Sequence, residues 1–306
     1  MYTSYFRLNE KPFSLTPDTQ FYLNTQSHLD ALNTLLLALR NGEGFIKIVG
    51  EVGTGKTILC RWLLSQLDSA YCTAYIPNPY LRPDELKAVV AEELQVPNVA
   101  QLATHQLIPA ISQHLIDLAA AGKQAVLVID EAQSMPRETI EALRLLTNLE
   151  TEKQKLLQVV LFGQPELDKL LDRADLRQLK QRIMFAEYLK PFDRKTIAHY
   201  VDFRLASAGY DGPHLFTPDA LRLLSSASGG VPRLINILCH KAMLSAFGRG
   251  DSPVTSYHLA RAVQDTPESL WWGRSVVLFR RLYRPLFGGL LILALALAVL
   301  HYGGIL

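Results

Sequence analysis

The sequence has little from which a disulfide or metal scaffold could be built. Its three cysteines, Cys60, Cys72 and Cys239, are far apart and show no paired metal-ligand spacing. This excludes a disulfide framework or a zinc finger and fits a reducing compartment. Charge of one sign is also missing, because 31 basic and 29 acidic side chains leave a net charge of +2. That balance argues against a protein held on nucleic acid mainly by bulk positive charge. Residues 1–10 also lack the apolar core of a secretion signal.

One stretch lacks charge altogether. Residues 286–306 contain no Asp, Glu, Lys or Arg, and a helix of this length would span ~30 Å, the thickness of the hydrocarbon core of a bilayer. Arginines precede the stretch and no charged residue follows it. The positive-inside rule therefore predicts a single transmembrane helix with the preceding residues in the cytoplasm. The alternative, a buried core helix, would rarely run this long without a polar face.

The rest of the chain alternates short apolar runs with helical patterns. Apolar runs of strand length lie at residues 44–49, 73–76, 125–129, 156–162 and 185–189. Helical patterns separate them, which predicts an α/β fold with a parallel sheet covered on both faces. From Asp193 onward only helical patterns occur. We therefore expect four regions: an α/β core with an N-terminal linker at 1–190, a small all-helical domain at 191–266, a basic and aromatic juxtamembrane segment at 267–285, and the transmembrane helix at 286–306.

The strongest signal is a phosphate-binding loop. Residues 50–57 match the pattern G-x-x-x-x-G-K-[ST], after a predicted strand and at the start of a predicted helix. Such glycines let backbone N–H groups converge on phosphate oxygens, and the helix N-terminus adds positive potential. We expect Lys56 to contact the β- and γ-phosphates of ATP and the Thr57 hydroxyl to ligate Mg²⁺. The expected nucleotide-binding residues are Gly50, Glu51, Val52, Gly53, Thr54, Gly55, Lys56, Thr57 and Ile58. A glycine-rich turn with an exposed lysine is the alternative.

Two carboxylates follow the apolar run at 125–129. Asp130 and Glu131 emerge at its carboxyl end, which is the edge at which open α/β sheets bind ligands. Asp130 is suited to hold Mg²⁺ through water, and Glu131 is suited to orient and deprotonate the attacking water. An acidic helix start is the alternative, since carboxylates there are favoured by the helix dipole.

These two motifs resemble those of an ATPase of the AAA+ class. Further segments resemble the ExeA/GspA family of secretion ATPases, and together they cover roughly residues 1–265: Tyr5–Leu8, Pro12–Asp18, His28–Leu32, Asp130–Gln133, Leu143–Thr151, Phe162–Leu167 and Leu176–Ile183. The short chain with its terminal apolar stretch is most similar to the MshM branch, which is associated with biogenesis of the mannose-sensitive haemagglutinin (MSHA) type IV pilus.

The resemblance also suggests roles for two polar residues after strands. Gln164 follows the run at 156–162 by two residues, and we expect it to sense the γ-phosphate, although AAA+ proteins more often use Asn or Thr there. A turn glutamine is the alternative. Asn78, after the run at 73–76, is a candidate to hold Glu131 in an inactive orientation. A simple Pro-Asn-Pro turn is its alternative.

Three arginines are further candidates. Arg182 resembles the arginine finger that a neighbouring AAA+ subunit inserts in trans, Arg177 is the second choice, and a solvated basic helix face is the alternative. Arg233 lies in the first predicted turn of a helix, where a cation opposes the dipole by ~0.3–1 kcal/mol, so a bound phosphate would compensate it. AAA+ lids carry their second sensor at this position.

The resemblance therefore implies an AAA+ P-loop ATPase in the bacterial inner membrane that binds Mg-ATP between the core and a helical lid. It implies a homo-oligomer, with pilus or type II secretion assembly proteins as partners. The alternative is a DNA-binding AAA+ regulator of the transposition or initiator type. The near-neutral charge, the apolar stretch and the lack of a recognisable winged-helix segment disfavour it, so nucleic acid is not an expected partner. A nucleotide-dependent scaffold with little turnover is disfavoured by Glu131.

Overall fold

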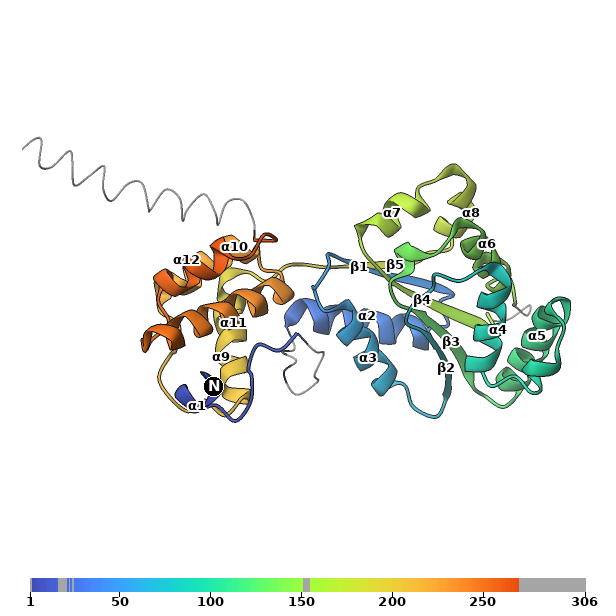
Figure 1. Ribbon diagram of the computed structural model, residues 1–306. Helices are drawn as coiled ribbons and strands as arrows, with labels where there is room; N and C mark the ends of the chain where they lie inside the picture. The colour runs from blue at the N-terminus through green and yellow to red at the C-terminus, as the bar shows by residue number, and fades with distance from the viewer. Residues whose placement is uncertain (1, 16–20, 22, 24, 151–154, 270–306) are drawn as a thin grey trace, which may run out of the picture. The chain divides into compact units, whose positions relative to one another are not determined.

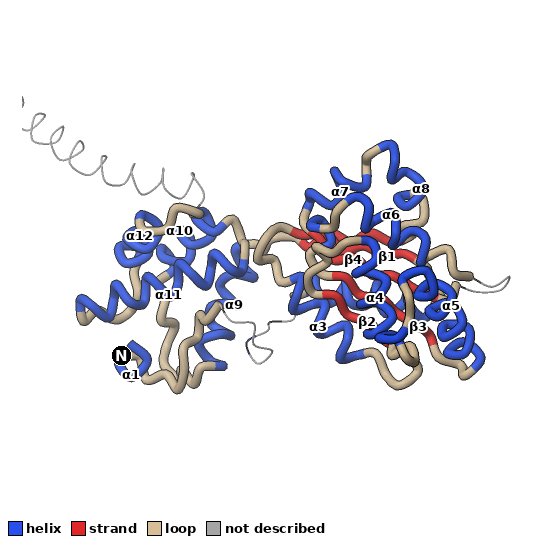
Figure 2. Tube along the Cα trace, turned by 45° about the vertical axis from the view of Figure 1, so that its right-hand side comes forward, coloured by secondary structure: helices blue, strands red, loops and turns tan. Residues whose placement is uncertain are grey.

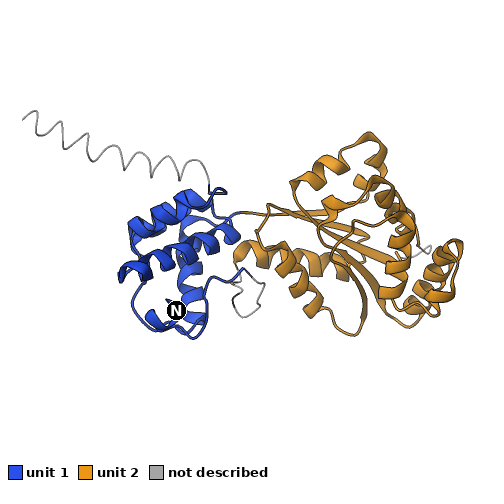
Figure 3. Cartoon of the chain, in the orientation of Figure 1, with its two compact units in different colours: residues 1–21, 191–306 blue, residues 22–190 orange. Residues whose placement is uncertain are grey.

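The chain forms two compact units in the computed structural model, which describes residues 2–15, 21, 23, 25–150 and 155–269. One unit comprises residues 22–190, and the other combines residues up to 21 with those from 191 onward (Figure 3). The predicted transmembrane helix at 286–306 and most of the juxtamembrane segment lie outside the described residues. Within the described residues, no helix has both the length and the apolar character needed to cross a bilayer.

A five-stranded parallel sheet forms the centre of the α/β unit (Figure 1). Its strand order is β2-β3-β4-β1-β5, and every pairing is parallel. The strands are β1 (Phe45–Gly50), β2 (Tyr71–Ile76), β3 (Gln124–Ile129), β4 (Leu157–Gly163) and β5 (Phe185–Leu189). The parallel α/β fold predicted from the sequence is therefore confirmed.

Helices connect the strands and cover both faces of the sheet, as Figure 2 shows. They are α2 (Gln26–Arg40), α3 (Lys56–Gln66), α4 (Pro83–Glu93), α5 (Thr104–Ala120), α6 (Arg137–Leu146), α7 (Pro165–Leu171) and α8 (Arg177–Lys180), with short 3-10 turns η2 (Val99–Gln101), η3 (Ala132–Ser134) and η4 (Ala174–Leu176).

Strand β3 shows why the central runs are continuously apolar. Its alternate residues point to opposite faces of the sheet. Leu127 and Ile129 pack in the core that contains residues of α4, α5 and α6. Val126 and Val128 pack in the opposite core, with residues of α2 and α3. A strand buried on both faces has no solvent side, so it carries no polar alternation.

The register of the sheet brings three strand ends to one edge. Ile129 at the end of β3 pairs with Leu161 in β4, and Val49 near the end of β1 pairs with Gly163 at the end of β4. The loops that follow β1, β3 and β4 therefore begin side by side. This edge is where a parallel α/β sheet binds its ligand.

The second unit is helical. It contains α1 (Tyr2–Tyr5), α9 (Arg194–Ser207), α10 (Pro218–Ser228), α11 (Pro232–Arg249) and α12 (Ser256–Gln264). Asp193 caps α9 by accepting a hydrogen bond from the Thr196 N–H at 2.7 Å. Thr217 caps α10 in the same way, with Pro218 as its first residue.

The N-terminal segment packs in the helical unit, whereas the sequence suggested that it forms a linker within an α/β core at 1–190. The physical reason is its aromatic content. Tyr2 and Phe6 are buried, and the Tyr2 hydroxyl contacts His240 Nδ1 on α11 at 2.9 Å. Arg204 on α9 is also buried and donates from Nε to the Pro12 carbonyl at 2.5 Å. These contacts tie the first residues of the chain to α9 and α11.

Candidate functional site

The loop between β1 and α3 has the backbone of a phosphate cradle. Gly53 and Gly55 adopt positive φ angles of 80° and 97°, which only glycine adopts without strain. The curl turns the chain directly into α3, whose first residue is Lys56. The free N–H groups of this helix start and its dipole both favour an anion.

Lys56 is folded back onto the loop. Its side chain is 4% exposed, and Nζ donates to the carbonyls of Gly50 at 2.8 Å and Glu51 at 3.1 Å. Burial lowers the pKa of Lys56, and the nearby charges of Glu131 and Asp130 partly oppose that shift. An ammonium held in this way gains a stronger partner when a phosphate enters, since ion pairing to phosphate is charge-assisted.

Thr57 and Asp130 meet across the sheet edge. The Thr57 hydroxyl donates to Asp130 Oδ2 at 2.7 Å. Burial raises the pKa of Asp130, while the Thr57 hydroxyl and the Glu131 N–H, which donates to Oδ1 at 2.9 Å, lower it. A hydroxyl beside a carboxylate is an all-oxygen donor set of the kind that Mg²⁺ prefers. These two residues therefore fit the metal that the sequence predicts.

Two glutamines hold the Glu131 carboxylate. Oε2 accepts from Gln133 Nε2 at 2.6 Å and from Gln164 Nε2 at 3.0 Å. The Gln133 amide is oriented by its other end, because Oε1 accepts from the Gln164 backbone N–H at 2.9 Å. Glu131 itself has a φ of 51°, a strained value for a non-glycine residue and one that clusters at functional sites.

Sequence reasoning missed Gln133 and suggested Asn78 instead. The Asn78 Oδ1 accepts from the Tyr80 N–H at 3.2 Å, as expected for the turn alternative. Within the described residues, the side-chain donors to Glu131 are Gln133 and Gln164. The available signal was local, since Gln133 follows Glu131 by two residues.

The three candidate arginines lie in different settings. Arg182 follows α8, is half-buried and donates to the Thr147 carbonyl at 3.2 Å. Arg177, the first residue of α8, is exposed and lines a cavity of about 450 Å³ with Arg173 and Lys180. Arg233 is exposed in the first turn of α11. Since it belongs to the helical unit, its role as a sensor stays a prediction, as do the roles of Arg182 and Arg177.

The remaining site residues come together at one edge. The residues of the loop from Gly50 to Ile58, the pair Asp130 and Glu131, and Gln164 all lie at the carboxyl ends of β1, β3 and β4. Three segments far apart in the sequence thus meet through the sheet.

Comparison with known proteins agrees with this arrangement. Residues 39–171 match the AAA domain family. The domain and the site together define an AAA+ P-loop ATPase. Over 265 residues the chain is 44% identical to general secretion pathway protein A of Aeromonas hydrophila, covering 87% of this chain and 48% of that protein. The chain is a homologue of that protein, which confirms the resemblance to the ExeA/GspA family, and it spans about half the length of this curated relative.

Solved structures with lower identity share the fold. The crystal structure of Cdc6p from Pyrobaculum aerophilum has a TM-score of 0.64 at 18% identity, over 83% of this chain and 70% of that one. The Aeropyrum pernix ORC2 protein has a TM-score of 0.60 at 16% identity, over 84% of this chain and 71% of that one. At these identities the likeness shows the fold alone.

Proposed function

We propose that this AAA+ ATPase is anchored in the bacterial inner membrane and uses Mg-ATP hydrolysis to act on proteins of a secretion or pilus assembly machinery. The observation that carries the hydrolytic part is the meeting of Lys56, Thr57, Asp130, Glu131 and Gln164 at one sheet edge. A site for binding alone would not need the second carboxylate or the amides that hold it.

The chain's own groups divide the chemistry between them. The loop N–H groups and Lys56 hold the phosphates. Thr57 and Asp130 hold Mg²⁺, which when bound neutralises charge on the phosphate oxygens. Glu131 takes the proton of the attacking water as general base. Its Oε2 receives two amide donors, and among the described residues no side chain donates to Oε1, which can accept from that water. Gln164 connects Glu131 to the γ-phosphate, because its amide can donate to either.

The proposal also includes the three candidate arginines, which lie outside this sheet edge. Arg182, or Arg177 as the second choice, acts in trans at the site of a neighbouring copy. Arg233 contacts the nucleotide from the helical lid. Both roles require an assembled homo-oligomer or a closed lid and rest on the AAA+ class.

The cellular setting rests on the homologue and on the sequence. The 44% identity to general secretion pathway protein A favours a type II secretion context. An MshM-like role in type IV pilus assembly is part of the same proposal and rests on the resemblance of the sequence alone. Residues 286–306 lack charged side chains and follow four arginines at 274, 280, 281 and 284, which supports a single membrane span with the ATPase in the cytoplasm.

Two variants test the hydrolytic part, assayed as phosphate release by the detergent-purified chain. Lys56→Ala should weaken nucleotide binding, because it removes the cation that faces the phosphates. Glu131→Gln should bind ATP nearly as wild type does and turn over at least ~10²-fold more slowly, the lower range for a lost general base. Wild-type turnover in Glu131→Gln would overturn the assignment of the base.

A reporter fusion and a pull-down test the setting. A reporter after Leu306 should be periplasmic and one at Met1 cytoplasmic, whereas release of the chain from membranes by carbonate would remove the span. Proteins captured from detergent-solubilised membranes by Glu131→Gln, which should hold ATP, identify the machinery.

A further inference from the structure

A buried histidine of α2 contacts the phosphate loop. His28 is 2% exposed, and its Nε2 lies 2.9 Å from the Thr54 carbonyl oxygen. Its Nδ1 lies 2.6 Å from the Thr25 hydroxyl. A carbonyl oxygen can only accept, so Nε2 carries the proton and Nδ1 accepts from Thr25. Burial lowers the pKa of His28, which favours the neutral ring, and its two partners select this tautomer.

The contact fixes one peptide of the cradle. The Thr54–Gly55 peptide is trans, and in a trans peptide the carbonyl and the N–H point in opposite directions. A histidine that holds the Thr54 carbonyl therefore directs the Gly55 N–H away from the His28 ring. Within the described residues that N–H has no acceptor. It is left for a ligand.

The loop needs such a support. Gly55 has a φ of 97°, and glycine adopts positive and negative φ about equally well. The Thr54–Gly55 peptide can therefore rotate at little steric cost, which would turn a carbonyl oxygen instead of an N–H toward the phosphate. Gly55 also gives the ring its room, because a Cβ at this position would lie 2.9 Å from His28 Nε2.

We propose that His28 is a positioning residue for nucleotide binding: it holds the Thr54 carbonyl so that the Gly55 N–H faces the phosphates. The proposal rests on the proposed function of the loop and adds to it a side chain outside the loop. Thr25 completes the arrangement by orienting the ring. The first turn of α2 and the phosphate loop therefore act together.

Two substitutions of His28 separate positioning from packing. In His28→Gln the amide nitrogen occupies roughly the place of Nε2 and can still donate to Thr54. In His28→Asn the shorter amide occupies the place of Nδ1 and does not reach. Titration calorimetry with Mg-ADP should show about tenfold weaker binding for His28→Asn, the effect of one lost buried hydrogen bond. His28→Gln should stay within about threefold of wild type.

The chain supplies a matched control. His258 in the helical unit is also 2% exposed and follows a threonine by three residues, so His258→Asn should lower the melting temperature and leave Mg-ADP affinity unchanged. The proposal is overturned if His28→Asn binds Mg-ADP as wild type does, or if His28→Gln is as weak as His28→Asn.

Lys56→Ala distinguishes this failure from failure of the proposed function. If Lys56→Ala weakens Mg-ADP binding and His28→Asn does not, only the role of His28 is wrong. If Lys56→Ala binds as wild type does, or wild type does not bind, the phosphate site itself is wrong and the role of His28 with it.

Discussion

The two units share one local motif, a threonine followed three residues later by a buried histidine, but the two histidines contact different partners. His28 in the α/β unit and His258 in the helical unit each follow a threonine by three residues at the start of a helix, and both rings are buried. In the helical unit, His258 Nδ1 accepts from the Thr255 N–H at 3.0 Å. His258 Nε2 lies 3.0 Å from Asp251 Oδ2, only seven residues away. The Nε2 of His28 instead meets a loop carbonyl 26 residues away.

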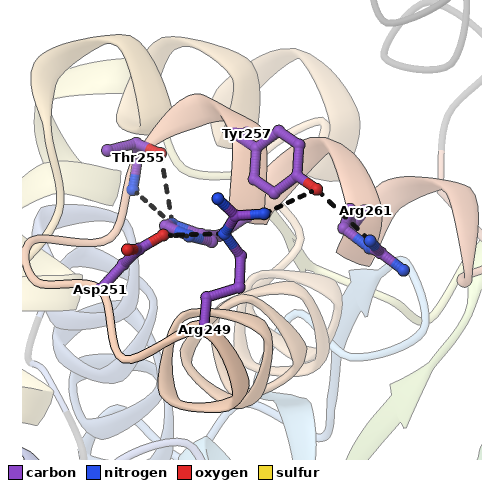
Figure 4. Close-up of polar contacts among 6 residues, drawn as sticks. Arg249, Asp251, Thr255, Tyr257 and Arg261 are labelled. Carbon is purple, nitrogen blue, oxygen red and sulfur yellow. Dashed lines mark hydrogen bonds and ion pairs between the residues drawn. The ribbon is translucent and has the colours of Figure 1, made fainter.

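The wider networks differ in the same way. Figure 4 shows Arg249, Asp251, Thr255, Tyr257 and Arg261 around the end of α11 and the start of α12. All of them come from one short stretch of the chain, so this network is local in sequence. The site of the α/β unit joins residues from three strand ends. We infer that changes in the helical network alter stability, whereas changes at the strand ends alter nucleotide chemistry.

The largest expected effect concerns Arg182, which would extend the strand-end site to a second copy. Arg182→Ala should reduce turnover by up to ~10³–10⁵, the contribution of arginine fingers elsewhere. Mixing it with Glu131→Gln should restore phosphate release, since some interfaces then pair an intact base with an intact arginine. Rescue should rise with protein concentration.

Subunit exchange is established first by pulling down a differently tagged copy. If exchange occurs and no mixture exceeds the separate variants, Arg182 does not act in trans. The same mixture with Arg177→Ala then tests the second choice.

A smaller effect is expected at Gln133. Gln133→Ala removes one donor to Glu131 and the acceptor of the Gln164 N–H, so turnover should fall about tenfold, as for one lost hydrogen bond in the transition state. Mg-ADP affinity should remain near that of wild type. Asn78→Ala is the control, because Asn78 closes a turn. A greater loss of turnover in Asn78→Ala than in Gln133→Ala would reverse the assignment.

The helical network provides the opposite test. Asp251→Ala leaves buried His258 without its carboxylate partner, which should lower the stability of the helical unit. Denaturant unfolding, monitored through the hydrogen exchange of α11 and α12, measures this loss. Turnover under native conditions should be unchanged. A turnover defect with normal stability would remove the contrast between the units.

The smallest effect is a pH dependence. Burial lowers the pKa of His28 below its ordinary value of 6.5, so the unfolded chain binds this proton more readily than the folded one. The neutral His28 ring therefore costs the folded protein no stability above the pKa that His28 has in the unfolded chain. As pH falls below that value, the folded protein loses stability relative to the unfolded chain. His28→Gln should show a smaller fall in melting temperature between about pH 7.5 and pH 5.5 than wild type. An equal fall in both proteins would show that other groups carry it.

Much of the fold and part of the site could be predicted from sequence. The apolar runs around 125–129 and 156–162 predicted buried strands, because burial on both faces leaves no place for polar residues. The G-x-x-x-x-G-K-[ST] pattern indicated Lys56 and Thr57, since its spacing is a local property of the loop and helix. The position of the first residues could not be read in this way, because Tyr2 and Phe6 look alike whichever core they enter.

The amino-acid sequence by itself determined the local chemistry: the phosphate loop and the paired carboxylates. Only the tertiary structure decided what these groups meet. Asn78 and Gln133 are both plausible partners of Glu131 in the sequence, but the pairing of β3 with β4 brings Gln164 beside Gln133 and leaves Asn78 in its turn. Likewise, His28 supports the phosphate loop because α2 packs beside α3, while His258 closes a turn. Hydrogen bonds depend on distances of a few tenths of an ångström, and those are set by packing between segments that no local pattern connects.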